Sequence, residues 1–89
     1  MDHAVLYRVD MEKSNLRMVD LRFANLRESY LKETQLNSAK LDEAEFEGAL
    51  LIRTDFTNSD LASYQYKEAR QIESIILPNG QTYQPTAEK

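Results

Sequence analysis

The sequence contains no cysteine and no tryptophan, and it has one histidine, two glycines and two prolines among 89 residues. Without cysteine, the chain can form neither disulfides nor thiolate metal sites, and its redox compartment is unconstrained. Two glycines leave no material for a glycine-rich phosphate loop, and the chain lacks a nucleophile elbow and a metal-ligand spacing. The histidine, His3, lies in the first three residues, where we interpret it as fortuitous rather than as a base or a ligand. We therefore expect no catalytic residue, no metal and no cofactor, and a protein that is not an enzyme.

Charge and hydropathy exclude further classes of protein. Fifteen acids and eleven bases give a net charge of −4, and an acidic chain without a basic stripe is a poor candidate for binding nucleic acid. No apolar run approaches the roughly eighteen residues of a membrane span. Asp2 and His3 at the start do not resemble a signal peptide. We expect one small cytoplasmic domain, residues 1–89, with no membrane span.

What the sequence does contain is a period of five residues. In groups of five from residue 4, AVLYR VDMEK SNLRM VDLRF ANLRE continues without insertion to residue 68, and every central residue is apolar or aromatic. The residue two positions before each centre is small or β-branched until Tyr64 breaks the rule. The central residues are Leu6, Met11, Leu16, Leu21, Leu26, Leu31, Leu36, Leu41, Phe46, Leu51, Phe56, Leu61 and Tyr66.

Neither regular backbone can bury this pattern. On an α-helix, five residues advance by about 500°, so successive centres move around the axis by about 140°. On a flat strand, an odd period places each centre on the opposite face from the last. A chain that turns once per repeat presents the first and third residue of each group to one interior, and stacked turns of such a chain form a solenoid.

The repeat resembles that of the pentapeptide repeat family, whose motif is A-(D/N)-L-x-x. The resemblance covers residues 4–68, and the glycine that often closes a repeat occurs only as Gly48. It implies an all-β fold, a right-handed quadrilateral β-helix (a pentapeptide repeat solenoid) with a short C-terminal cap. The Asp or Asn before the centre is present in six groups, as Asp10, Asn15, Asp20, Asn25, Asp55 and Asp60.

Four sides per coil make twenty residues, so residues twenty apart should stack in columns. Residues 69–89 form the expected cap and tail, because an open solenoid end exposes core and unpaired backbone. Tyr64 at a small-residue position predicts a ring that plugs this end, and Ile75, Ile76 and Leu77 supply apolar surface to lie across it. A similar tail closes many cyanobacterial members of the family, so we expect a bacterial, cyanobacterial origin.

The first coil predicts a binding end. Only three residues precede the first repeat, too few to cover a coil, so this end should meet a partner or a second copy, or belong to a longer chain. Self-association is the simpler version, since an edge that pairs with its own copy hides both edges. Exposed apolar residues are nevertheless common on any protein surface. The outward apolar residues of this coil are Val5, Tyr7, Met18 and Phe23.

The group ALLIR breaks the polar pattern of the outer walls. Leu51 fills the core, so Leu50 and Ile52 point outward on either side of it. Tyr30 lies one coil below Leu50, and Ile72 is expected one coil above Ile52 if the register continues. The alternative is that the C-terminal tail folds over this wall. We predict a protein-binding patch of Tyr30, Leu50, Ile52 and Ile72, with Lys32, Arg53 and Arg70 as its polar rim.

Two classes of function remain. The first is a non-enzymatic protein-protein interaction or scaffold module, as a small subunit of a larger assembly. The alternative follows from the resemblance, because some family members mimic DNA and inhibit the DNA-binding enzyme gyrase. Just over three coils at about 4.8 Å each give a rod of about 16 Å, against about 34 Å for one duplex turn. Glu28, Glu45 and Glu47 also share their side with Arg8 and Arg27, so we favour the interaction module.

Overall fold

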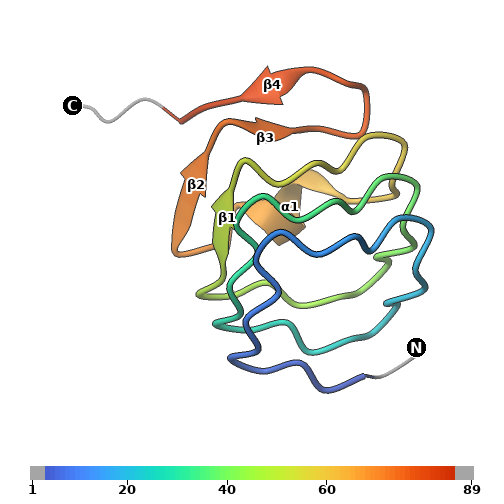
Figure 1. Cartoon of the computed structure of the whole chain (residues 1–89), viewed down its shortest axis with the longest axis vertical. Helices are drawn as coiled ribbons and strands as arrows, with labels where there is room; N and C mark the ends of the chain where they lie inside the picture. The colour runs from blue at the N-terminus through green and yellow to red at the C-terminus, as the bar shows by residue number, and fades with distance from the viewer. Residues whose placement is uncertain (1–3, 86–89) are drawn as a thin grey trace.

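The computed structural model describes residues 4–85, and the interpretation of His3 therefore lies outside the described residues. The chain winds into coils that stack along the long axis of the molecule (Figure 1). The first coil, in blue, lies at the bottom of this view, and the last strands, in orange, lie at the top. Segments twenty residues apart in the sequence are therefore neighbours in space.

Regular secondary structure is sparse in this stack. The elements are β1 (Leu50–Ile52), α1 (Ser63–Tyr66), β2 (Gln71–Glu73), β3 (Ile75–Ile76) and β4 (Thr82–Tyr83). β1 pairs with β2 in parallel, and β3 pairs with β4 antiparallel. The walls below them are held by isolated parallel bridges. The stacked repeat coil is thus confirmed, whereas the strands are few and short and α1 departs from the all-β prediction.

The register between coils is twenty residues. Val5 bridges Asn25, and Tyr30 bridges Leu50. The N–H of Leu6 donates to the carbonyl of Asn25 at 2.8 Å, and the same pattern repeats every five residues as far as Leu36. Each coil therefore has four sides of five residues, and the predicted columns of central residues are confirmed.

Each side ends in a β-turn that begins at the central residue. In the first turn the N–H of Val9 donates to the carbonyl of Leu6 at 3.2 Å, and Arg8 has a φ of 62°. A left-handed residue at the third position belongs to a type II turn and favours glycine. Every fifth residue from Arg8 to Asn58 has a positive φ, and Gly48 is the only glycine among them. Nearly every corner thus carries the strain of a left-handed residue that has a side chain.

The Asp or Asn before the central residue supports the corner. Oδ1 of Asp10 accepts a hydrogen bond from the N–H of Glu12 at 3.0 Å, which closes an Asx turn. This bond occupies a backbone donor that the turn would otherwise leave without a partner. The same bond to the N–H two residues later is made by Asn15, Asp20, Asn25 and Asp55.

The interior is filled by side chains. The central residues from Leu21 to Phe56 are buried, and the rings of Phe46 and Phe56 meet edge to face with centroids 6.1 Å apart. The buried hydroxyl of Thr34 donates to the carbonyl of Met11 at 2.7 Å. Among residues 4–85, no buried side-chain polar atom is without a hydrogen-bond partner.

One extra residue enters the coil after α1. The N–H groups of Arg70 and Gln71 both donate to the carbonyl of Ala49, at 2.8 and 3.4 Å, as in a β-bulge. The register is displaced by one residue from this point, so Ile72 pairs with Leu51 and not with Ile52.

The expected place of Ile72 on the outer wall is therefore wrong. Partners in a parallel pair point to the same face of the sheet, and Leu51 is buried, so Ile72 packs against the core. Ile76 bridges Asp55 in the same displaced register, which places Ile75 inside, where it is fully buried. The displaced coil thereby covers the last regular one.

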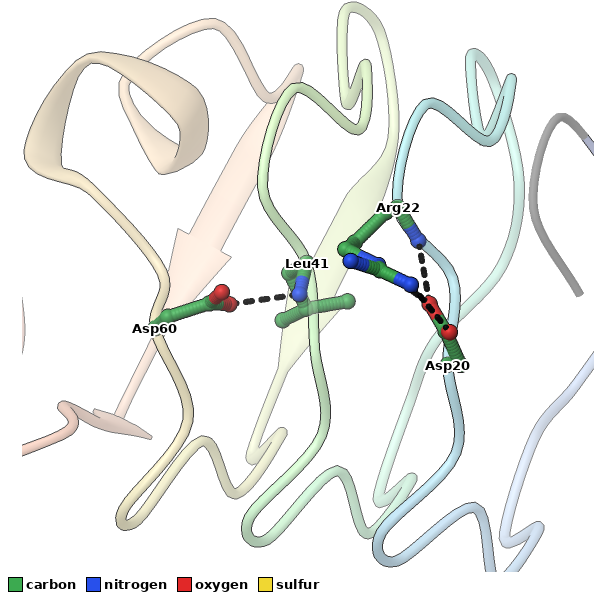
Figure 2. A network of polar contacts seen from close by, with 4 residues as sticks. All are labelled: Asp20, Arg22, Leu41 and Asp60. Carbon is green, nitrogen blue, oxygen red and sulfur yellow. Dashed lines mark hydrogen bonds and ion pairs between the residues drawn. The ribbon is translucent and has the colours of Figure 1, made fainter.

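Side chains replace missing backbone at the C-terminal end of the stack. Gln65 in α1 is 2% exposed, and its Nε2 donates to the carbonyls of Leu41 and Ala44 at 2.7 and 2.9 Å. Asp60 accepts from the N–H of Leu41 across the coils (Figure 2). Tyr64, predicted to plug this end, is 56% exposed because α1 turns it outward. The residue that fills the role is its neighbour Gln65.

Candidate protein-binding surface

The second side of the coils carries the predicted apolar patch. Tyr30 and Leu50 face each other across a parallel bridge, and Ile52 lies at the end of β1. Tyr30 is 47% exposed, whereas Leu50 and Ile52 are half-buried. These three predicted residues are brought together at a hollow of about 360 Å³, and Ile72 is not among them. The hollow, named here the wall hollow, is lined by Glu12, Tyr30, Lys32, Leu50, Ile52, Arg70 and Gln71.

The C-terminal tail packs elsewhere. The ring of Tyr83 lies with its centroid 5.1 Å from that of Tyr66, and the hydroxyl of Ser74 donates to Gln84 at 2.8 Å. Residues 77–85 do not line the wall hollow. In the part of the chain that the structure describes, the wall therefore stays open to a partner.

Two cationic side chains flank the apolar residues. Arg70 is exposed and makes no ion pair with any residue from 4 to 85, and Lys32 is half-buried beside it in the hollow. Arg53, which was predicted to belong to the rim, pairs with Glu33 at 2.7 Å and does not line the hollow. The rim is therefore narrower than the sequence predicted.

A second hollow of about 430 Å³ shares Tyr30 and Arg70 with the first. It opens where Gly48 leaves the corner column without a side chain, since a Cβ there would lie 3.0 Å from Cγ of Glu28. Glu28 is held by Nε of Arg8 at 3.0 Å. Sequence reasoning missed this corner hollow, although a single glycine at a corner position was a signal for it.

The outward apolar residues of the first coil do not form one face. Val5 and Tyr7 lie on the first side, Met18 at the corner after the third, and Phe23 at the corner after the fourth. Val5 and Met18 are 74% and 79% exposed. The guanidinium of Arg8 lies 5.3 Å from the centroid of the Tyr7 ring, within cation–π range. Their role in protein binding stays a prediction.

Acids on the outer walls are interleaved with arginines. Arg8 pairs with Glu28, and Arg27 pairs with Glu47 at 3.7 Å, each one coil apart. Within one turn, the Arg22 side chain donates to the Asp20 carboxylate (Figure 2) and lowers the pKa of Asp20 to about 2. No group of acids or histidines within residues 4–85 could hold a metal ion. Among the same residues, no helix has the length and apolarity to span a membrane.

Comparison with known proteins gives a family and similarity to solved structures. The model of the pentapeptide repeats family matches in eight copies over residues 4–41 and 29–63. No curated protein matches the chain. A crystal structure similar to this chain is that of HetL, a pentapeptide repeat protein involved in heterocyst differentiation regulation from the cyanobacterium Nostoc sp. strain PCC 7120. The identity is 20% and the TM-score 0.35, over 93% of this chain and 51% of HetL, so the chain spans about half of that protein's length.

Proposed function

The chain belongs to the pentapeptide repeat family, and from this premise we propose that it is a non-enzymatic protein-binding module. It presents the wall hollow to a protein partner, as a scaffold or small subunit of a cytoplasmic assembly. We further infer that the coils form a right-handed quadrilateral β-helix, which the four five-residue sides per coil support.

The observation that carries this proposal is the apolar break in an otherwise polar wall. Tyr30, Leu50 and Ile52 are adjacent, partly exposed and set in a concave surface, which suits the centre of an interface. The backbone beneath them is fixed by bonds between coils, so binding would order few groups. A rigid, pre-formed site of this kind loses little conformational entropy when it binds.

The pairing of charges argues against the alternative of DNA mimicry. A DNA-like face needs a regular array of unpaired anions, whereas Glu28, Glu33 and Glu47 are each paired with an arginine. We therefore favour a protein partner that binds through shape and apolar contact.

The proposal is tested by the double change Leu50→Glu with Ile52→Lys. These side chains lie on the outer wall, so the variant should keep the melting temperature of the wild type and lose the partner. Partner recovery is measured by cross-linking and mass spectrometry in an extract of the native organism, and stability by circular dichroism.

A matched control is Lys40→Glu with Asp42→Lys. These exposed residues flank the central Leu41 on another wall just as Leu50 and Ile52 flank Leu51, and the exchange also leaves the net charge unchanged. The control should retain both the fold and the partner. Equal recovery by wild type, control and wall variant would reject this wall as the binding site.

A further inference from the structure

The two hollows meet at Arg70 and Tyr30, and their chemistry specifies one kind of occupant. Arg70 and Tyr30 line both hollows, Leu50 and Ile52 form the apolar floor of one, and the Gly48 corner opens the other. An aromatic ring, two branched aliphatics and a cation thus share one continuous surface. Such a surface favours a ligand that carries an apolar group beside an anion.

The charges that reach this surface leave a local cationic excess. Arg8 and Glu28 neutralise each other at 3.0 Å, and Arg53 and Glu33 do so at 2.7 Å. Gln71 donates to Glu73 just above the hollow, and that carboxylate does not line it. Arg70 and Lys32 then face the single carboxylate of Glu12 among the residues that line the wall hollow. In a chain of net charge −4, this is a cationic spot on an acidic protein.

The side chain of Arg70 is suited to bind a carboxylate. Its guanidinium presents a planar fork of donors that matches a carboxylate in bidentate geometry. No acceptor within residues 4–85 occupies it. Its backbone N–H is fixed to the carbonyl of Ala49 at 2.8 Å, so the side chain starts from a defined place beside Gln71, the residue that pairs with Leu50.

We propose, on the basis of the protein-binding function above, that the occupant of the joined hollows is an extended peptide segment of the partner that carries an Asp or Glu close to an apolar side chain. The apolar side chain packs against Tyr30, Leu50 and Ile52, and the carboxylate pairs with Arg70 and Lys32. Side chains two residues apart on an extended chain lie on one face, about 7 Å apart. The acid and the apolar residue are therefore expected two positions apart.

The test is a selection of random heptapeptides displayed on phage against the folded chain. Enriched peptides should carry Asp or Glu two residues from Leu, Ile, Phe or Tyr. Binding of a synthetic enriched peptide is then measured by fluorescence anisotropy. Arg70→Gln should weaken it by about two- to fivefold, the size expected for one exposed charge pair. The affinity of the wild type should fall with added salt, and that of Arg70→Gln should fall less.

Two variants make the result decisive. Arg70→Glu should remove the preference for acids and enrich Lys or Arg in their place, whereas Arg17→Gln, an exposed arginine on another wall, should change nothing. Peptides without acids, acidic peptides that bind Arg70→Glu equally well, or no enrichment at all would each overturn the proposal. If the Leu50 and Ile52 variant loses the natural partner and any of these results is also obtained, the protein-binding function is retained. Only the acidic-apolar peptide is then rejected as the ligand.

Discussion

Replacement of Gln65 tests how the open end of the coil is closed. Its amide makes three hydrogen bonds with backbone groups: Nε2 donates to the carbonyls of Leu41 and Ala44 at 2.7 and 2.9 Å, and Oε1 accepts from the N–H of Ala62 at 2.7 Å. Gln65→Met keeps the volume of the side chain and removes all three bonds. A buried backbone group left without a partner costs about 1–3 kcal/mol. The carbonyl of Leu41 still accepts the turn bond from the N–H of Ala44, so two of the three groups are left without a partner and we expect a loss of about 2–6 kcal/mol.

Urea unfolding followed by circular dichroism measures this loss. With a slope of about 1 kcal/mol per molar urea, the lower end of the range shifts the midpoint by about 2 M. Tyr64→Ala is the matched control, since Tyr64 is adjacent in α1 but 56% exposed and should leave the midpoint almost unchanged. A shift below about 0.5 M for Gln65→Met would show that the amide does not close the coil end.

Gln65→Glu adds a pH signature to the same reasoning. A carboxylate there still accepts from Ala62 but faces two carbonyl oxygens, so burial and these acceptors raise its folded pKa above the unfolded value of about 4.3. Stability is then fully present below the unfolded pKa and is lost as pH rises through the folded pKa. The free energy of unfolding of the variant should therefore approach that of the wild type near pH 4 and lie below it at pH 7. A difference from wild type that is the same at both pH values would refute the donor role of the amide.

Three further predictions follow from the coil, the Asp20 turn and the first wall. Deletion of Gln71 should be tolerated, because it removes the extra residue of the bulge. Deletion of Lys32 from an uninterrupted wall should abolish the cooperative thermal unfolding transition, because it displaces every later core residue. Arg22→Gln should raise the pKa of Asp20 from about 2 toward its ordinary 3.8, as measured from carboxyl chemical shifts. The stabilisation from this pair is present above the unfolded pKa of Asp20 and is lost as pH falls through the folded pKa. If the first coil self-associates, light scattering should detect more than a monomer and Tyr7→Asp should reverse it; a monomeric wild type would reject that prediction.

The central columns could be predicted from sequence because two features of the sequence identify each central residue. A residue such as Leu36 has apolar neighbours five residues away in both directions, and Thr34, two positions before it, is small enough for the interior. Leu36 and Thr34 are both fully buried. The wall patch could be predicted from the same five-residue phase, since Leu50 and Ile52 must point outward once Leu51 is inside.

The end of the stack escaped prediction because α1 changes the phase. In a helix, neighbouring residues do not alternate between inside and outside, so Tyr64 faces solvent and Gln65 is buried. Nothing in the spacing of the repeat says that a side-chain amide will replace a backbone strand. The sequence favoured the apolar ring as the plug, whereas the open end holds the carbonyl of Ala44 and the N–H of Ala62, for which the Gln65 amide supplies the partner.

The displaced register, by contrast, left a signal in the sequence. Ile72 and Leu77 are five residues apart, and Ile75 stands two before Leu77, which is the spacing of a centre and its preceding inward residue. The repeat therefore resumes after residue 71 with its phase moved by one. This shift has a direct consequence for the surface, because it turns Ile72 into the core and pairs Gln71 with Leu50, while Arg70, just before the extra residue, remains exposed at the wall hollow. With Ile72 on the wall, the patch would have four apolar members beside its cationic rim. With Ile72 inside, the polar residues Gln71 and Glu73 stand opposite Leu50 and Ile52, and the apolar floor ends beside Arg70 and Lys32. The position of one inserted residue therefore sets how far the apolar surface of the wall extends.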